Sequence, residues 1–152
     1  MPNAKDIIIT VDNINFLILG ERGTGKSFFA STFPPPIFLF DCDKQATAYR
    51  GLDVDYQQYE FTSAGWLKFE KDLSMIMQGK QPRDNYLNTS EIPIEKKYKT
   101  IIIDSMTAML SLAMERALCI NPSRNEAGGA KYEVHYSLIR TLIEAQMKKV
   151  LS

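Results

Sequence analysis

One eight-residue stretch, residues 20–27, restricts the fold of this chain more than any other part of the sequence. Its letters, G-E-R-G-T-G-K-S, match the phosphate-binding pattern G-x-x-x-x-G-K-[ST] at every fixed position. The apolar run at residues 14–19 predicts a buried strand before it, and residues 27–33 can begin a helix after it. Glycines let the backbone between strand and helix curl, so that several N–H groups face one phosphate. We therefore predict a P-loop that binds a nucleotide.

The side chains of this motif have separate roles in the predicted site. The ammonium of Lys26 is expected to reach the β- and γ-phosphates, where it also serves catalysis. The Ser27 hydroxyl is placed to hold Mg²⁺. The full set of expected nucleotide contacts is Gly20, Glu21, Arg22, Gly23, Thr24, Gly25, Lys26, Ser27 and Phe28.

The composition of the chain is that of one globular domain. It has 152 residues, of which 45% are hydrophobic and 24% charged, as in ordinary soluble domains. Its 18 basic and 18 acidic side chains cancel, so no overall basic field attracts nucleic acid. Two cysteines suggest neither a disulfide framework nor a zinc cluster. Without a signal-peptide pattern or an apolar run of about 20 residues, we expect a cytoplasmic protein with no membrane contact.

Strand and helix patterns alternate along the chain. Strands are predicted at residues 7–11, 37–40 and 99–104, helices at 62–77 (capped by Thr62 or Ser63), 107–119 and 132–150, and polar loops at 79–99 and 121–131. This alternation predicts an α/β fold with a mainly parallel sheet flanked by helices. Ligands of such folds sit at the carboxyl ends of the strands.

Three carboxylates, Asp41, Asp43 and Asp104, fall at these predicted strand ends and should converge with the P-loop on one crevice. Asp104 is the expected Walker B acid, which orients Mg²⁺ directly or through water; its alternative role is to cap the next helix. Ser105 stands where many AAA+ ATPases have a glutamate base, so the base must come from elsewhere. Asp43 is the best candidate to polarise the attacking water, the alternative being a solvated turn carboxylate.

Two further segments resemble the RecA-like P-loop ATPases. Residues 99–110, K-T-I-I-I-D-S-M-T-A-M-L, resemble their Walker B strand and the helix after it, and residues 38–43, F-L-F-D-C-D, resemble their strand ending in D-x-E, whose last acid is the catalytic glutamate. The proline-terminated helix after the P-loop is most similar to the core-only RecA-like ATPases of bacteriophages, which are implicated in recombination and single-strand annealing. The resemblance implies ATP and Mg²⁺ as cofactors, a homo-oligomeric assembly, and a host-cytoplasm location for a phage protein.

The sequence departs from this family at two points. Asp43 is one methylene shorter than the family's glutamate, so we expect slow hydrolysis. The family pattern continues past the last predicted helix into a further strand and loop. We therefore predict that residues 1–152 are a single P-loop NTPase domain that is truncated at the C-terminus. This domain would be the N-terminal part of a longer RecA-like core. The loop at 121–131 takes the place of the first DNA-binding loop. There Arg124 and Lys131 would bind single-stranded DNA weakly through its phosphates, unless the loop is only a polar connection.

Two other functions stay open, a P-loop small-molecule kinase and a non-catalytic nucleotide-binding module. A GTPase is not supported, because the chain has neither D-x-x-G after a predicted strand nor N-K-x-D. Tyr49, Arg50 and Tyr56 are candidates to stack on adenine. His135, the single histidine, is expected to be a structural or surface helix residue. Neighbouring carboxylates should raise the pKa of the Cys42 thiol and make it a poor nucleophile.

Overall fold

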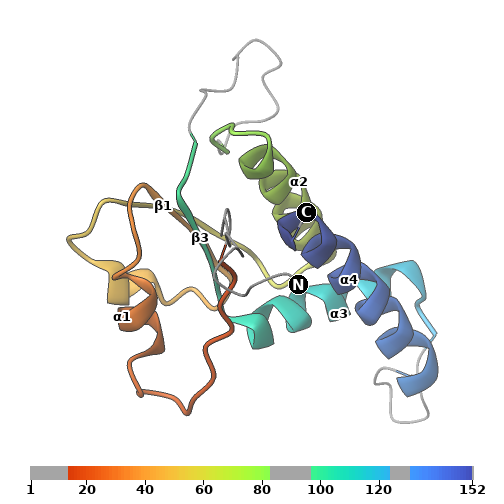
Figure 1. Ribbon diagram of the computed structural model, residues 1–152. Coiled ribbons are helices and arrows are strands. Elements are labelled where there is room, and N and C mark those ends of the chain that lie inside the picture. Colours follow the sequence, from red (N-terminus) through yellow and green to blue (C-terminus); the bar gives the residue numbers. More distant parts are fainter. Residues whose placement is uncertain (1–13, 83–96, 124–130, 152) are drawn as a thin grey trace, which may run out of the picture.

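The computed structural model describes residues 14–82, 97–123 and 131–151. Its centre is a three-stranded sheet in the order β2-β1-β3 (Figure 1). The strands are β1 (Ile37–Asp41), β2 (Val54–Gln58) and β3 (Thr100–Asp104). Both pairings are parallel, and Asp41 lies opposite Gln58 on one side and Asp104 on the other. The carboxyl ends of all three strands therefore meet at one edge. The strand predicted at residues 7–11 lies outside the described residues.

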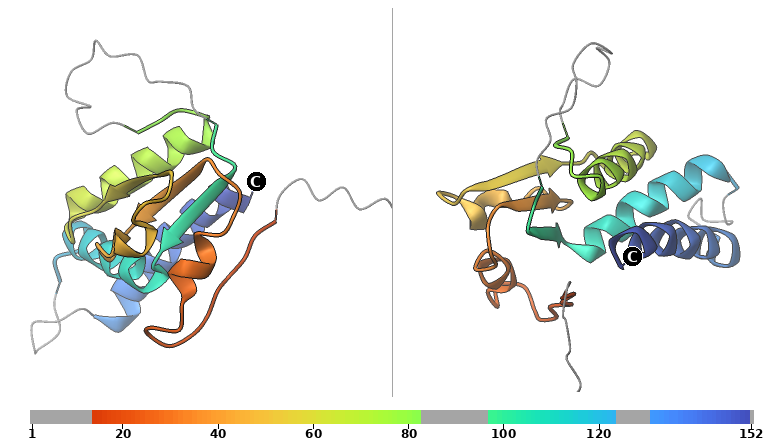
Figure 2. Two further views of the ribbon diagram at one scale, coloured as in Figure 1. Left: turned by 90° about the vertical axis from the view of Figure 1, so that its left-hand side faces the viewer. Right: turned by 45° about the horizontal axis from the view of Figure 1, so that its top comes forward.

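Helices cover both faces of this sheet. The short helix α1 (Lys26–Ala30) lies on one face, and α2 (Ser63–Met77), α3 (Met106–Ile120) and α4 (Ser137–Leu151) cover the other (Figures 1 and 2). A 3₁₀ turn, η2 (Ala46–Tyr49), follows β1, and a π-helical turn, η3 (Tyr132–Tyr136), leads into α4. The predicted α/β fold with a parallel sheet flanked by helices is confirmed. None of the helices in the described ranges is long and apolar enough to cross a membrane.

The central strand β1 is buried over its whole length, as its apolar sequence predicts. Its side chains alternate between two clusters. Phe38 and Phe40 pack into the larger cluster with α2, α3 and α4. Ile37 and Leu39 pack into the smaller cluster on the α1 face, which also contains Ala30, Tyr49 and Ile102. Burial of this apolar surface is the main force that fixes the strand between the two helical layers.

Side-chain caps begin two of the long helices. The Thr62 side chain accepts a hydrogen bond from the Gly65 N–H at 3.0 Å, and the Ser105 side chain accepts one from the Ala108 N–H at 3.3 Å. Such caps satisfy backbone donors that a helix leaves unpaired at its first turn. The helices predicted over 62–77 and 107–119 form with these boundaries to within one residue at each end. Ser105 is therefore a helix cap.

The strand predicted before the P-loop is wrong. Residues 14–20 form no strand in the structure, and the side chains of Ile14, Phe16, Leu17 and Leu19 are 61–81% exposed. A strand needs a neighbour that pairs its N–H and C=O groups, so an apolar run alone does not fix one. The prediction also missed β2, because its letters, V-D-Y-Q-Q, lack the apolar character of a buried strand.

Candidate functional site

The P-loop is an exposed curl of backbone directly before α1. Gly23 and Gly25 have φ angles of 81° and 84°, a left-handed conformation that glycine adopts without steric cost. At both glycines, no atom lies within 4 Å of the position that a Cβ would take. Residues 20–25 are all exposed, as is Phe28 on α1. The loop is thus open to a ligand from solvent.

The ammonium of Lys26 lies against this loop. It donates hydrogen bonds to the carbonyl oxygens of Gly20 at 2.9 Å and Glu21 at 2.6 Å. The Thr24 hydroxyl also donates to the Glu21 carbonyl, at 2.9 Å. Lys26 is thus positioned among oxygen acceptors at the mouth of the loop, and an ammonium makes the same kind of bond with phosphate oxygens.

Ser27 and Asp104 come together although 77 residues separate them. The Ser27 hydroxyl donates to Asp104 Oδ2 at 2.5 Å, which joins the start of α1 to the end of β3. Tyr49, from η2, donates its hydroxyl to the same carboxylate oxygen at 3.2 Å. Burial, followed by the charge of Asp104, raises the pKa of the Tyr49 phenol, so its hydroxyl stays a donor. Hydroxyl and carboxylate oxygens of this kind are the ligands that Mg²⁺ prefers.

The two carboxylates after β1 differ in environment. Asp41 is 1% exposed, and it accepts hydrogen bonds from the N–H groups of Gln45 at 2.9 Å and Ala46 at 3.1 Å, and from Gln58 Nε2 at 2.7 Å. These bonds fix the turn that follows the strand. Asp41 is therefore an anchor of the backbone that carries Asp43.

Asp43 lies half-buried in that turn. Burial and the charge of Asp104 raise the pKa of the Asp43 carboxyl, a hydrogen bond with Asp41 and the charge of Asp41 raise it further, and the Gln45 N–H opposes the rise. Because Asp41 and Asp104 lie opposite each other at the paired ends of β1 and β3, the turn that carries Asp43 begins at the same sheet edge as the Ser27–Asp104 pair. A raised pKa brings a carboxylate closer to neutral pH, which suits a proton acceptor.

Cys42, between these two acids, has a thiol pKa raised to about 12, first by burial and then by Asp41, Asp43 and Asp104. The predicted direction is confirmed, although burial is the larger cause. Among the described residues, no three His, Cys, Asp or Glu side chains form a group able to hold a metal ion. A magnesium ion shared with nucleotide phosphates does not require such a group, because it keeps only one or two protein ligands.

The loop predicted to contact DNA is described only at its two ends. Lys131 is exposed, and Arg124 lies outside the described residues. His135 is fully buried; its Nδ1 accepts from the Lys131 N–H at 2.7 Å and its Nε2 donates to the Asn121 carbonyl at 2.8 Å. The histidine therefore ties the two ends of the loop together, which is the structural role expected of it.

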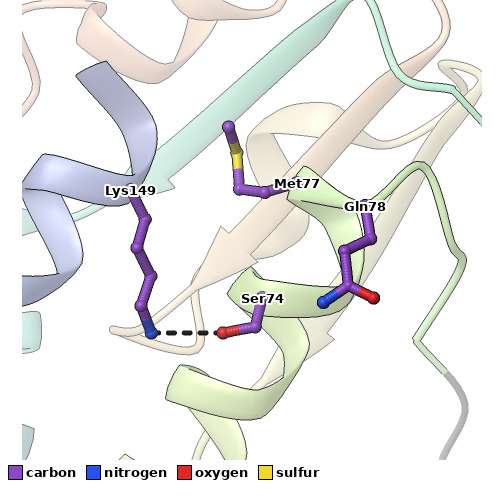
Figure 3. A pocket seen from close by; sticks show the side chains of 4 residues that line it. All are labelled: Ser74, Met77, Gln78 and Lys149. Atoms are coloured by element: carbon purple, nitrogen blue, oxygen red, sulfur yellow. Dashed lines mark hydrogen bonds between the residues drawn. The ribbon is translucent and has the colours of Figure 1, made fainter. Parts of the chain in front are cut away.

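A shallow cavity of about 340 Å³ lies between α2 and α4, lined by Ser74, Met77, Gln78 and Lys149 (Figure 3). The Lys149 ammonium crosses it to the Ser74 hydroxyl at 3.1 Å. Because α2 and α4 cover the sheet face opposite α1, this cavity is separate from the P-loop. Its polar contact joins two helices of the core.

Sequence reasoning overlooked the position of Tyr49 in the site. Its side chain is only 5% exposed, within the cluster on the α1 face, so its ring is not available to stack on adenine. Arg50 and Tyr56 are exposed and stay candidates for that contact. No sequence pattern links Tyr49 to Asp104, because only the sheet pairing brings η2 beside the end of β3.

A family model described as an AAA domain matches residues 12–152. No curated protein and no solved structure matches the chain. The family match includes the P-loop and all three strand-end carboxylates, and it agrees with the prediction of a P-loop ATPase.

Proposed function

We propose that this chain, which belongs to the AAA domain family of P-loop ATPases, binds Mg-ATP through residues 20–28 and hydrolyses it slowly. One observation carries the proposal, the contact of Ser27 Oγ with Asp104 Oδ2 at 2.5 Å. Phosphate loops of this pattern place the serine hydroxyl and the Walker B carboxylate beside one magnesium ion. The same pair of oxygens lies here next to an exposed, glycine-rich loop.

The residues of the loop would bind and orient the phosphates. Lys26 would exchange the carbonyl oxygens of Gly20 and Glu21 for phosphate oxygens, which carry full negative charge and make stronger bonds with an ammonium. Ser27 has one hydrogen and two lone pairs. It can therefore keep its hydrogen on Asp104 while a lone pair faces the cation. When bound, Mg²⁺ supplies positive charge that offsets the charge on the transferred phosphoryl group.

Asp43 is the proposed base. Its carboxylate would accept a proton from the water that attacks the γ-phosphate, and its raised pKa makes it a better acceptor than an ordinary aspartate. The short side chain supports slow turnover by the isolated chain. Completion of the site by a neighbouring copy in a homo-oligomer would raise the rate, because outside positive charge on the phosphoryl group is worth orders of magnitude.

The finer proposal is a RecA-like role in phage-type DNA recombination or single-strand annealing in the cytoplasm. It rests on the resemblance of residues 38–43 and 99–110 to RecA-like ATPases and on the polar loop after α3. Arg124 and Lys131 would then contact DNA phosphates. A salt titration of fluorescent single-stranded oligonucleotide should give weak binding that falls steeply with salt and weakens further when both residues are replaced by Ala.

Calorimetry with ATP, GTP and ADP, each with Mg²⁺ and with a chelator, tests the nucleotide proposal. We expect Mg-ATP to bind the parent and Lys26→Ala to lose binding while it stays folded, because the lysine contributes charge rather than packing. Lys99→Ala is the matched control, since this exposed lysine precedes β3 at the opposite end of the sheet. Undiminished binding by Lys26→Ala would refute the site. Binding without hydrolysis would favour the non-catalytic module, and phosphate transfer to a metabolite would favour the kinase.

A further inference from the structure

Tyr49 combines a buried ring with a hydroxyl that reaches the proposed metal site. The ring lies in the cluster formed by Ala30 of α1, Ile37 and Leu39 of β1 and Ile102 of β3. This packing joins the helix after the P-loop to two strands of the sheet. The ring is therefore held in place by apolar contacts that do not depend on its hydroxyl.

The hydroxyl donates to Asp104 Oδ2, the same atom that accepts from Ser27. A carboxylate that receives two donors on one oxygen is restricted in its rotation, and its second oxygen is left to face a cation or its water shell. Tyr49 differs from Ser27 in what it can do next. Ser27 has to offer a lone pair to Mg²⁺, whereas Tyr49 needs only to keep donating to Asp104.

We infer that Tyr49 is a positioning residue for the magnesium ion of the bound nucleotide, acting by holding the Asp104 carboxylate in its coordinating orientation. The inference rests on the proposed function, because it requires that Asp104 serve a Mg-nucleotide. It assigns to η2, a segment outside the P-loop and the Walker B strand, a part in metal binding. Asp104 would then be held by donors from two separate segments, α1 and η2.

Tyr49→Phe tests this role because it keeps the ring and removes the hydroxyl. The measured quantity is the magnesium enhancement, the ratio of ATP affinity with Mg²⁺ to ATP affinity in chelator. We expect this ratio to fall about tenfold, the order expected for loss of one hydrogen bond to a carboxylate. ATP affinity in chelator should stay near that of the parent, and the thermal unfolding midpoint should fall by only a few degrees, because one hydrogen bond to a carboxylate is lost while the ring packing is kept. In hydrolysis, KM for Mg-ATP should rise.

Tyr98→Phe is the matched control. Its hydroxyl donates to Asp55 Oδ2 at 2.6 Å, and Asp55 lies near the amino end of β2, away from the P-loop. This second loss of a tyrosine–carboxylate bond should leave the magnesium enhancement unchanged. In an Asp104→Asn background, Tyr49→Phe should lower the enhancement no further, because Tyr49 acts on Mg²⁺ only through the charged carboxylate that Asp104→Asn has already removed.

Two results would overturn the inference. The first is a full magnesium enhancement in Tyr49→Phe; if ATP affinity falls equally with and without Mg²⁺, Tyr49 is a purely structural residue. The second is additive loss in the double variant. A parent protein that binds ATP no more tightly with Mg²⁺ than without it would overturn both this inference and the proposed function, which distinguishes that failure from the other two.

Discussion

Replacing Asp104 by Asn should separate magnesium binding from folding. The amide has nearly the same shape, and its carbonyl oxygen can still accept from Ser27 and Tyr49. Hydrogen bonds to charged groups contribute roughly 1.5–3 kcal/mol and neutral ones roughly 0.5–1.5 kcal/mol. Each of the two bonds should therefore lose about 1 kcal/mol. Relief of the repulsion between Asp104 and Asp43 opposes this loss, so we expect the free energy of unfolding to fall by about 1 kcal/mol.

The effect on magnesium should be larger, because the variant removes the negative charge itself. Loss of one partner of a paired charge costs about 2–5 kcal/mol, and the lower end applies to the half-buried Asp104. A loss of about 2 kcal/mol lowers the magnesium enhancement of ATP affinity about 30-fold. ATP affinity in chelator should not fall, since the removed charge repels the phosphates.

Calorimetric titration with and without Mg²⁺, together with urea unfolding, gives both quantities. Asp55→Asn is the matched control because Asp55 also accepts from two side chains, Tyr98 at 2.6 Å and Gln81 at 3.4 Å. It makes the same change in net charge away from the P-loop and should keep the full enhancement. An Asp104→Asn protein with undiminished magnesium enhancement would refute the assignment of Asp104 as the metal carboxylate.

Two further predictions concern the turn after β1 and the start of α2. Because the pKa of Asp43 is raised in the folded state, its ionised form destabilises the fold. Asp43→Asn should therefore raise the free energy of unfolding at pH 7, and this gain in stability should disappear below the ordinary aspartate pKa of 3.8, where the carboxyl is protonated in both states. The same variant should abolish ATP hydrolysis, because it removes the proposed base. If the difference in the free energy of unfolding between Asp43→Asn and the parent is the same at pH 7 and at pH 3, the predicted pH dependence is refuted. A Cβ at Gly65 would lie 1.9 Å from the Glu60 carbonyl oxygen, so Gly65→Ala should cost about 2 kcal/mol despite the helix preference of alanine. Urea unfolding measures this cost, and parental stability in the variant would show that the backbone before α2 gives way freely.

Local patterns in the sequence were sufficient for much of the fold. The run from Ile37 to Phe40 forms a fully buried strand segment because its side chains are apolar on both faces. The residues at Thr62 and Ser105 begin helices because a hydroxyl there satisfies a free N–H of the first turn. The glycines of residues 20–27 predict the curl of the loop, because its left-handed φ angles favour glycine. Each of these properties depends on neighbours within a few residues.

Tertiary structure decided what depends on distant partners. The apolar run at residues 14–19 forms no strand, because pairing requires a second strand edge that the segment itself cannot supply. The polar segment Val54–Gln58 becomes a strand because β1 offers it such an edge. The sequence predicts Asp41 and Asp43 together at one strand end, and only the folded turn gives them different roles. Asp41 is buried and anchors the backbone, whereas Asp43 is half-buried and has a raised pKa. Tyr49 contacts Asp104 although 55 residues separate them. The parallel pairing of β1 with β3 brings the turn after β1 and the end of β3 to one edge of the sheet, and no local sequence pattern predicts this contact.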